Sequence, residues 1–411
     1  MKIRARRNQG QTMNNTAVVT SEFGRFIKFF IQELKPRGKW LTPFNVISIP
    51  TIIVGLIILY FRFTQGLGAV TNLSQQFPWG FWIGFDVVTG VALAGGAYVI
   101  CFVVVVMRLE KYHSILRVTV LNGFLAYVFY SGALLLDLGR PWHIANPLIG
   151  NSFGYNSVMF LVAWHFFVYT IALFVEFSPA IAEWAKVEKL RRFLVRLTLP
   201  TVILGFTISM LHQSGLGAMF LMAKPKIHPL WYSEYLPLLF FVSSIYAGLS
   251  MIIFEGTISH KVFGNLIGEK THHAHEEIIL GLAKAATITM FVYYFFQAFI
   301  LLHDGERWKL VNGFWGFWYL VEIIGFVLIP CFMFAHAVRN RKFGLIKVAS
   351  VITVLGVILN RLNVSIIAFK WDAVNKYYPS WEEIVITLMV VFIEVWVFRW
   401  IVTRMPVFSK E

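Results

Sequence analysis

The chain of 411 residues is 58% hydrophobic and 17% aromatic, and its mean hydropathy is +0.68. These values exceed those of ordinary soluble domains, so the composition excludes a water-soluble enzyme and indicates a membrane protein. The net charge of +15 does not indicate nucleic-acid binding, because Lys and Arg lie in the gaps between apolar runs, where they act as topology signals and lipid contacts.

A basic, polar tail covers residues 1–43. It holds no short apolar core followed by a small-residue cleavage site, so we expect no cleaved signal peptide. Apolar residues recur in it at helical spacing among basic side chains, which predicts an amphipathic helix on the membrane surface. These apolar residues are Phe23, Phe26, Ile27, Phe30, Ile31 and Leu34.

The rest of the chain is predicted to be an all-α polytopic membrane protein. It contains about ten apolar runs of a length that can cross a bilayer, and the seventh run is interrupted by Lys284. The predicted spans cover residues 44–63, 81–107, 118–136, 157–176, 196–221, 236–258, 277–302, 314–338, 344–369 and 381–402.

The distribution of Lys and Arg between the loops predicts the orientation. Most of these residues lie in the N-terminal tail and in the loops after the second, fourth and eighth spans, whereas the other loops hold only scattered cations. Short loops rich in Lys and Arg stay on the cytoplasmic side. Both termini are therefore predicted to be cytoplasmic.

Two loops share a short sequence similarity. The segment Leu136–Trp142 follows the third span, and the similar segment His303–Trp308 follows the seventh. The similarity indicates either that spans two to five and six to nine form related bundles, or a coincidence between two short segments.

Four spans place polar side chains in one layer. An ionisable group inside a bilayer costs about 2.5–3.5 kcal/mol on insertion scales, so its depth is informative. With a rise of about 1.5 Å per residue, Asp86 lies about 10 Å, and His165 about 12 Å, from the predicted non-cytoplasmic ends of their spans. His212 and Arg361 fall at a similar depth.

This layer meets the requirements of a quinone site. A quinone needs a hydrogen-bond partner for each carbonyl, a route for two protons and an apolar slot for its tail. Asp86 and either His165 or His212 can exchange the protons, and an aromatic side chain at a span end, such as Trp82, can stack on the ring. Glycines at positions 90, 95 and 96 allow close approach of a ring or a helix.

Each of these residues also has a structural interpretation. His212 and Gln213 would hydrogen-bond neighbouring helices, and His165 would be a satisfied core histidine. Asp86 is the hardest to explain structurally, because a lone carboxylate deep in an apolar helix usually marks a pathway.

Other charged residues are open to two interpretations. Asp137 and Arg140, three residues apart at a helix end, favour a capping ion pair over direct action on a substrate. Glu255 lies near a predicted cytoplasmic end, where a carboxylate can reach water. A deeper set forms either a proton relay or mutually paired struts; it consists of Glu322, Glu394, Lys284 and Arg399.

The chain has only two cysteines, Cys101 and Cys331, each inside an apolar run. It therefore cannot build a disulfide framework, a zinc site or an iron–sulfur cluster by itself. The close histidines at 272, 273 and 275 are typical of a solvated turn in a flexible cytoplasmic loop, not of a metal site. Any redox centre must come from a partner.

Three motifs together resemble the NrfD family, the polysulfide reductase membrane subunits, and within it the ten-span HybB-like branch. The motifs are PWGFWIGFD (78–86), LDLGRPW (136–142) and HQSGLG (212–217). The match runs from about residue 40 to 405 and includes Asn360–Asn363 and Pro379–Trp381.

The resemblance implies a fold and a division into parts. Residues 78–232 would form a first four-helix bundle with the quinone site, and residues 233–370 a second bundle with a proton route. The tail 1–43, the span at 44–63 and the segment 381–411 would flank these bundles.

The resemblance also implies a function. The chain would be a quinone-reactive subunit in the inner membrane of a prokaryote, with menaquinone or a similar quinone as bound substrate and no haem, metal or iron–sulfur cluster of its own. It would dock a ferredoxin-like iron–sulfur subunit on the non-cytoplasmic face. Further subunits, such as a multihaem cytochrome or a catalytic subunit, would complete the complex.

The resemblance, together with the depths of the polar residues, implies two groups of site residues. The expected quinone-binding or proton-accepting residues are Asp86, His165, His212, Gln213, Trp82, Asp137 and Arg140. The expected proton route consists of Glu322, Arg361, Glu255, Glu394 and Lys284.

Two other functions remain open at this point. His165 and His212 lie on consecutive antiparallel spans at similar depth, so the chain would be a b-type cytochrome if both bound one haem iron. The deep charges of the second half would instead suit a proton-conducting module without its own redox reaction.

Overall fold

The computed structural model describes residues 24, 28–29, 31–35, 37, 41–149, 154, 156–267, 269–311 and 313–408. The chain divides into two compact units, Met1–Ile47 and Ser48–Glu411. Among the described residues the structure is helical apart from turns, loops and one isolated antiparallel bridge between Ile227 and Phe369.

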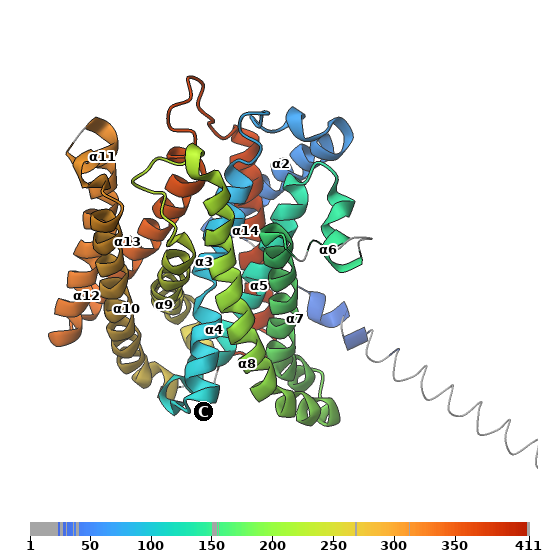
Figure 1. Cartoon of the computed structure of the whole chain (residues 1–411). Helices are drawn as coiled ribbons and strands as arrows, with labels where there is room; N and C mark the ends of the chain where they lie inside the picture. Colours follow the sequence, from blue (N-terminus) through green and yellow to red (C-terminus); the bar gives the residue numbers. More distant parts are fainter. Residues whose placement is uncertain are drawn as a thin grey trace, which may run out of the picture. The chain divides into compact units, whose positions relative to one another are not determined.

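Long helices make up the second unit (Figure 1). They are α2 (Pro43–Gln65), the broken span of η2 (Trp82–Thr89), α3 (Gly90–Leu93), α4 (Gly96–Cys101) and η3 (Phe102–Val106), α5 (His113–Asp137), α7 (Val158–Trp184), α8 (Glu188–Met219), α9 (Leu236–Phe263), α10 (Glu269–His303), α11 (Gly313–Leu320) with η9 (Val321–Leu328) and α12 (Ile329–Arg339), α13 (Phe343–Leu362) with η10 (Asn363–Ile367), and α14 (Trp381–Val402).

The prediction of an all-α membrane protein with ten spans is confirmed. Ten helical stretches of the described part are long and apolar enough to cross a membrane. The largest boundary differences are at the fourth, fifth and seventh spans, where α7 continues to Trp184, α8 begins at Glu188 and α10 begins at Glu269. Hydropathy misses these ends because charged residues continue the helices beyond the apolar run.

The histidines at 272, 273 and 275 do not lie in a flexible loop, as the sequence suggested, because they belong to the first turns of α10. Among the described residues, no group of three or more metal-binding side chains comes together.

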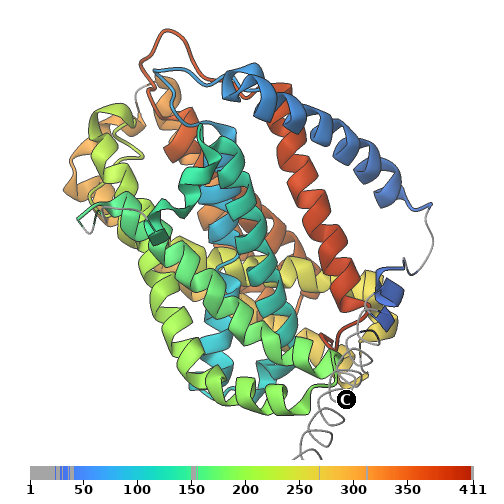
Figure 2. The ribbon, with the colours of Figure 1, turned by 90° about the vertical axis from the view of Figure 1, so that its right-hand side faces the viewer.

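Two sets of four helices pack in closed order within the second unit. α4, α5, α7 and α8 are successive neighbours, and α8 returns to α4; α9, α10, α12 and α13 repeat the pattern. Since α9 also packs against α3, α4 and α8, the division into bundles at residues 232 and 370 stays a prediction. Residues 48–65 of α2 run beside α14 (Figure 2), where Trp396 donates a 3.0 Å hydrogen bond to Ser48.

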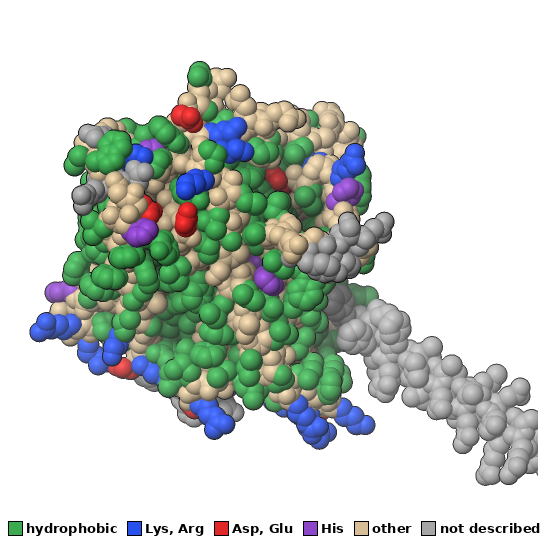
Figure 3. Space-filling view, in the orientation of Figure 1, with side chains coloured by type: hydrophobic (Ala, Val, Ile, Leu, Met, Phe, Trp, Pro, Cys, Tyr) green, Lys and Arg blue, Asp and Glu red, His purple; other side chains and the backbone are tan. Residues whose placement is uncertain are grey.

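One end of this unit is basic, which we call the basic end. Figure 3 shows Lys and Arg gathered along its lower edge, whereas the upper part mixes both signs of charge. Three of the turns at this end hold a cation in the left-handed backbone region, at Arg108, Lys186 and Arg341 (φ 57°, 58° and 50°). Glycine usually occupies such a helix-ending position, because a side chain there costs roughly 1–2 kcal/mol. Positive charge beside a helix C-terminus offsets part of that cost.

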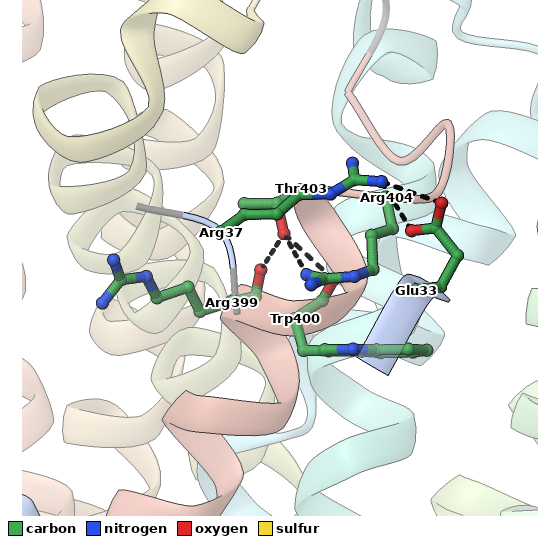
Figure 4. A network of polar contacts seen from close by, with 6 residues as sticks. All are labelled: Glu33, Arg37, Arg399, Trp400, Thr403 and Arg404. Atoms are coloured by element: carbon green, nitrogen blue, oxygen red, sulfur yellow. Dashed lines mark hydrogen bonds and ion pairs between the residues drawn. The ribbon is translucent and has the colours of Figure 1, made fainter. Parts of the chain in front are cut away.

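The last turn of α14 lies at the same end. Thr403 Oγ1 donates to the carbonyl of Arg399 (2.9 Å), and Arg404 donates to Thr403 Oγ1 (2.9 Å) and to the carbonyl of Trp400 (3.3 Å) (Figure 4). These bonds satisfy carbonyls that a helix leaves unpaired at its C-terminus.

In the first unit, residues 31–34 are helical. Arg37 forms an ion pair with Glu33 at 2.6 Å (Figure 4). The other residues of the predicted amphipathic helix, Phe23, Phe26, Ile27 and Phe30, lie outside the described residues, so its position on a membrane surface stays a prediction.

Glycines allow α9 to cross the second span at its break. A Cβ atom on Gly248 would lie 1.9 Å from the backbone nitrogen of Gly96, and one on Gly95 would lie 2.6 Å from the carbonyl oxygen of Ser244. Backbones approach this closely only where both helices present small residues. The ring of Tyr130 packs in the same way on Gly90.

We therefore expect Gly248→Ala to destabilise the protein severely, by more than about 3 kcal/mol, because the added methyl group meets backbone atoms that cannot move away. Gly132→Ala is the matched control, since a Cβ atom there has nothing within 4 Å. Thermal unfolding in detergent measures both variants. An unchanged midpoint for Gly248→Ala would show that the two spans do not cross at this glycine.

Candidate functional site

Asp86 lies on a widened turn of the second span. Residues Trp82–Thr89 form a π-helix, in which Thr89 Oγ1 donates to the carbonyl of Gly84 (2.8 Å). The Asp86 side chain is fully buried, and its Oδ2 accepts a 2.9 Å hydrogen bond from Thr387 of α14. Its Oδ1 has no hydrogen-bond partner among the described residues. Such π-turns occur frequently at functional sites.

His212 and Gln213 each join α8 to another helix through one polar atom. The buried His212 ring donates from Nδ1 to the carbonyl of Val162 on α7 (3.1 Å), and Gln213 Nε2 donates to the carbonyl of Val91 on α3 (2.9 Å). A carbonyl can only accept, so the neutral ring of His212 keeps Nε2 as an acceptor. The interhelical hydrogen bonds that the sequence suggested are therefore present.

The remaining polar atoms of this layer are not used by the protein. Within the described part of the chain, no protein group hydrogen-bonds to Asp86 Oδ1, His165 Nδ1, His212 Nε2 or Gln213 Oε1. Buried polar atoms in native structures nearly always have a partner, so each exception calls for a water, a ligand or a functional explanation. Asp86, His165 and His212, which were predicted from depth, and Gln213, which was predicted from its motif, thus share one property.

Trp82 joins the second span to α14, and Asp137 is the last residue of α5. The Trp82 ring is buried, and its Nε1 donates to the carbonyl of Glu383 at the start of α14 (3.1 Å). The structure contains no ion pair between Asp137 and the exposed Arg140 in the described region, which differs from the capping pair that the sequence favoured. Asp137 lies instead within electrostatic range of Arg62.

Arg62 is a functional neighbour that the sequence analysis missed. It is only 3% exposed, and it donates to the carbonyls of Leu136 (2.7 Å) and Leu138 (2.5 Å) at the C-terminus of α5. A cation at a helix C-terminus satisfies unpaired carbonyls and the negative end of the helix dipole. Because Arg62 takes this position, Arg140 is not needed there.

Glu383 is a second residue that the analysis missed. With Ser380 it forms a capping box at the start of α14, and it accepts hydrogen bonds from Tyr377 and from the backbone of Asn72 (3.3 Å). Tyr377 in turn accepts a 2.8 Å bond from the backbone of Phe81, just before η2. Burial, and then the hydrogen bond to Glu383, hold the pKa of Tyr377 well above its ordinary value, so it stays a neutral donor.

A row of carboxyl groups leads from Asp86 toward the basic end. Glu394 of α14 lies within electrostatic range of both Asp86 and Glu255, and Tyr130 lies within range of all three. Glu255 accepts a 2.5 Å hydrogen bond from Asn122. It also lines a cavity of about 40 Å³ at the basic end, together with the stacked rings of His260 and His275 (centroids 3.6 Å apart).

Glu322 and Arg361 form a separate network in the second half of the chain. Glu322, on the π-helix η9, accepts from Trp231 (2.7 Å), Asn360 (2.7 Å) and Asn363. Arg361 donates to Ser243 (2.6 Å) and to the oxygen of Asn360 (2.8 Å). Both charged side chains are about 1% exposed.

The predicted proton-route residues therefore do not form one set. Both oxygens of Glu322 are occupied by protein donors, which favours a strut. Lys284 is exposed on α10 and joins neither the network nor the carboxyl row. Glu255 and Glu394 belong to the row that reaches Asp86.

A known protein family matches most of this chain. The family model described as "Polysulphide reductase, NrfD" matches residues 69–370, which cover the helices that carry Asp86, His212, Glu255, Glu322 and Arg361. The chain belongs to the NrfD family, as the motifs indicated.

Three relatives align with nearly the whole chain. A protein from Nitratidesulfovibrio vulgaris (Hildenborough) is 42% identical over 93% of this chain and 98% of its own length. The probable Ni/Fe-hydrogenase 2 b-type cytochrome subunit of Escherichia coli K12 is 28% identical over 90% and 93%. The menaquinone reductase integral membrane subunit of N. vulgaris is 25% identical over 87% and 89%. These relatives fit the HybB-like branch, so this chain is a multi-pass membrane subunit of the oxidoreductase type.

The network around Glu322 leads to a stability prediction. Glu322→Ala should cost about 3–5 kcal/mol of unfolding free energy, because it leaves three buried donors without their acceptor and removes the negative charge near Arg361. Lys284→Ala should stay within about 0.5 kcal/mol. Denaturant unfolding in mild detergent compares the two. Equal stabilities would contradict the strut and return Glu322 to the candidates for a relay.

Proposed function

We propose that this chain is the quinone-reactive membrane subunit of a multi-subunit respiratory complex. It exchanges electrons between a membrane quinone, menaquinone or a close analogue, and a ferredoxin-like iron–sulfur subunit. The quinone head group lies in the layer of Asp86, His165, His212 and Gln213. The basic end faces the cytoplasm, so the partner docks at the opposite end.

The observation that carries this proposal is the set of unused polar atoms in the layer of Asp86, His212 and Gln213. When its carboxyl group is ionised, Asp86 offers Oδ1 as an acceptor, as Gln213 offers Oε1 and the neutral His212 ring offers Nε2. A quinol presents two hydroxyl donors at opposite ends of one ring. Acceptors on two different helices, η2 and α8, match that arrangement.

The reaction balances with groups that the chain and its partner supply. A quinone takes up two electrons and two protons to become a quinol, and the reverse reaction releases them. The electrons pass singly through the partner's iron–sulfur cluster, because two isolated cysteines leave this chain unable to bind one. Asp86 and His212 hold or accept the protons at the two quinone oxygens.

The relatives support the class of reaction. The names of two relatives describe a hydrogenase subunit and a menaquinone reductase subunit. In each case the name gives a membrane or cytochrome subunit of a larger oxidoreductase. A quinone-linked subunit without its own cluster fits that pattern.

The carboxyl row supplies one proton route. Asp86, Glu394 and Glu255 come from three different helices, and the last of them lines a cavity at the basic end. Carboxyl groups in series pass a proton by alternating between their protonated and ionised forms. One quinone oxygen thus communicates with the basic end through Asp86.

A variant of Asp86 tests the quinone site. Asp86→Asn keeps the hydrogen bond from Thr387 but cannot exchange a proton, so we expect quinol-dependent turnover of the assembled complex to fall at least about 100-fold. Asp372→Asn, which changes an exposed loop aspartate, is the matched control. Electron exchange between a water-soluble redox dye and the partner's cluster, which bypasses the quinone, is measured in parallel and should not change. Full quinol turnover in both Asp86→Asn and His212→Ala would place the quinone elsewhere.

A second candidate function is a b-type cytochrome, which the name of the E. coli relative favours. The contacts of His212 disfavour it, because α7 and α8 pack directly and the His212 ring contacts the rings of Phe166 and Tyr127 (centroids 5.4 and 5.9 Å away). We therefore expect no haem between His165 and His212.

A visible spectrum of the purified, reduced subunit separates the two functions. We expect no haem absorption band from this chain, whereas the haems of any partner would be lost with that partner. A band that disappears in His212→Ala but persists in His143→Ala would establish the cytochrome and overturn this assignment. His143 serves as the control because it lies in a short loop helix, Pro141–Ala145.

A further inference from the structure

A large cavity opens at the basic end between η3, α5, α7 and α8. Its volume is about 580 Å³, and charged side chains form its rim. Cys101 and Glu176 lie at its base, where Cys101 Sγ donates to Glu176 Oε2 (3.1 Å). The rim residues are Arg108, Glu110, His113 and Arg117. The walls between rim and base are mostly apolar, but the charged rim and the Cys101–Glu176 pair give water polar partners at both ends of the space.

The carboxyl group of Glu176 faces α8 at a glycine. A Cβ atom on Gly205 would lie 2.9 Å from Glu176 Oε1 and 3.5 Å from the ring of Tyr169. Glu176 and Tyr169 are two helical turns apart on α7 and so share one face. Gly205 therefore leaves the space in which Glu176 approaches the interior of the bundle.

Buried hydroxyl groups continue from this carboxyl toward the quinone layer. Tyr169, Ser209 and Tyr127 are each at most 1% exposed, and Ser209 is the side chain that both tyrosine hydroxyls approach. Gln213 lies next to Tyr127, and the ring of His212 packs on the ring of Tyr127 (centroids 5.9 Å apart). On α7, the eleven residues from Glu176 to His165 cover about 16 Å of depth.

The hydroxyl groups of Tyr127, Tyr169 and Ser209, which we call the hydroxyl file, lack full hydrogen bonds. Tyr127, Tyr169 and Ser209 each have a buried oxygen without a partner in the described part of the chain. By contrast, the buried Tyr98 is bonded to Ser244 (3.0 Å). A low-dielectric interior makes unpaired hydroxyls costly, so this file is where ordered water would complete the bonds. Water and hydroxyls in series conduct protons.

We propose that the cavity and this file form a second proton inlet, which connects the basic end to the His212 and Gln213 side of the quinone layer. The inlet rests on the proposed quinone function and assigns a route to the second proton. Each hydroxyl or water accepts one proton and passes one on, so only Glu176 and His212 change charge during transfer. The two protons of one quinone thereby travel separately, one through Asp86 and one through Glu176.

Thiol labelling tests whether water fills the cavity. In a background with both native cysteines replaced by serine, Val202→Cys places a thiol on the cavity wall and Leu204→Cys places one on the outward side of α8, where Leu204 is 49% exposed. A small charged methanethiosulfonate added to the basic side of sealed vesicles should label Val202→Cys at least about ten times faster. Labelling of Val202→Cys no faster than Leu204→Cys, or only by an uncharged apolar reagent, would overturn the inlet.

Proton uptake by the assembled complex in liposomes tests the route. Glu176→Gln should lower the protons exchanged at the basic side from about two to about one per quinone, or slow turnover about tenfold, with KM for the quinone unchanged. Tyr169→Phe should have the same effect, whereas Tyr98→Phe and the exposed Glu188→Gln should not. An unaltered proton count and rate in Glu176→Gln and Tyr169→Phe would contradict the route.

The two proposals fail differently. If Asp86→Asn abolishes quinol turnover in detergent but the wild-type complex exchanges no protons at the basic side, the quinone site stands and the inlet is wrong. If quinol turnover survives Asp86→Asn and His212→Ala, the quinone site itself is misplaced. If Glu176→Gln lowers the unfolding temperature enough to account for its lost activity, Glu176 has a structural role and the inlet is also rejected.

Discussion

A polar side chain inside a membrane has no bulk water to bond to, so each one must find a partner in the bundle. This constraint separates two carboxyl groups that look alike in the sequence. Glu322 is enclosed by three donors and lies near Arg361, which makes it part of a closed network. Asp86 receives one donor, from Thr387, and keeps one oxygen open. The closed carboxylate holds helices together, whereas the open one keeps an oxygen for the quinone that we propose.

Widened helical turns position both carboxyl groups. Asp86 lies in the π-helix Trp82–Thr89, and Glu322 lies in Val321–Leu328. A π-turn inserts a residue into the ordinary repeat, so the side chains beyond it shift around the helix axis. The shift changes the depth of a residue little, so depth counted at about 1.5 Å per residue stays correct. It does change which neighbouring helix a side chain faces, so that prediction fails. The layer of polar groups could therefore be predicted, but the hydrogen-bond partners of its side chains could not.

The sequence predicts the spans well because apolar runs report directly on bilayer thickness. It does not predict Arg62 or Glu383, since each acts on a segment far away in the chain: Arg62 caps α5 from 74 residues away, and Glu383 binds the backbone of Asn72, 311 residues away. The hydroxyl file could have been predicted from residue spacing. Residues 165, 169 and 176 share a face of α7, and residues 205, 209 and 212 share one of α8. The aromatic richness of the whole chain concealed this stripe.

The positions of the two cavities carry an energetic consequence for the proposed function. Asp86 lies near the end opposite the basic end, and Glu255 and Glu176 both line cavities at the basic end. In the proposed function, protons that pass between these places would cross most of the membrane, while the electrons would enter and leave on the partner's side. Each charge moved across the full potential corresponds to about 2.3 kcal/mol per 100 mV. A quinone reaction supplied in this way couples electron transfer to the membrane potential without any moving part, because the separation is built into where the carboxyl groups lie.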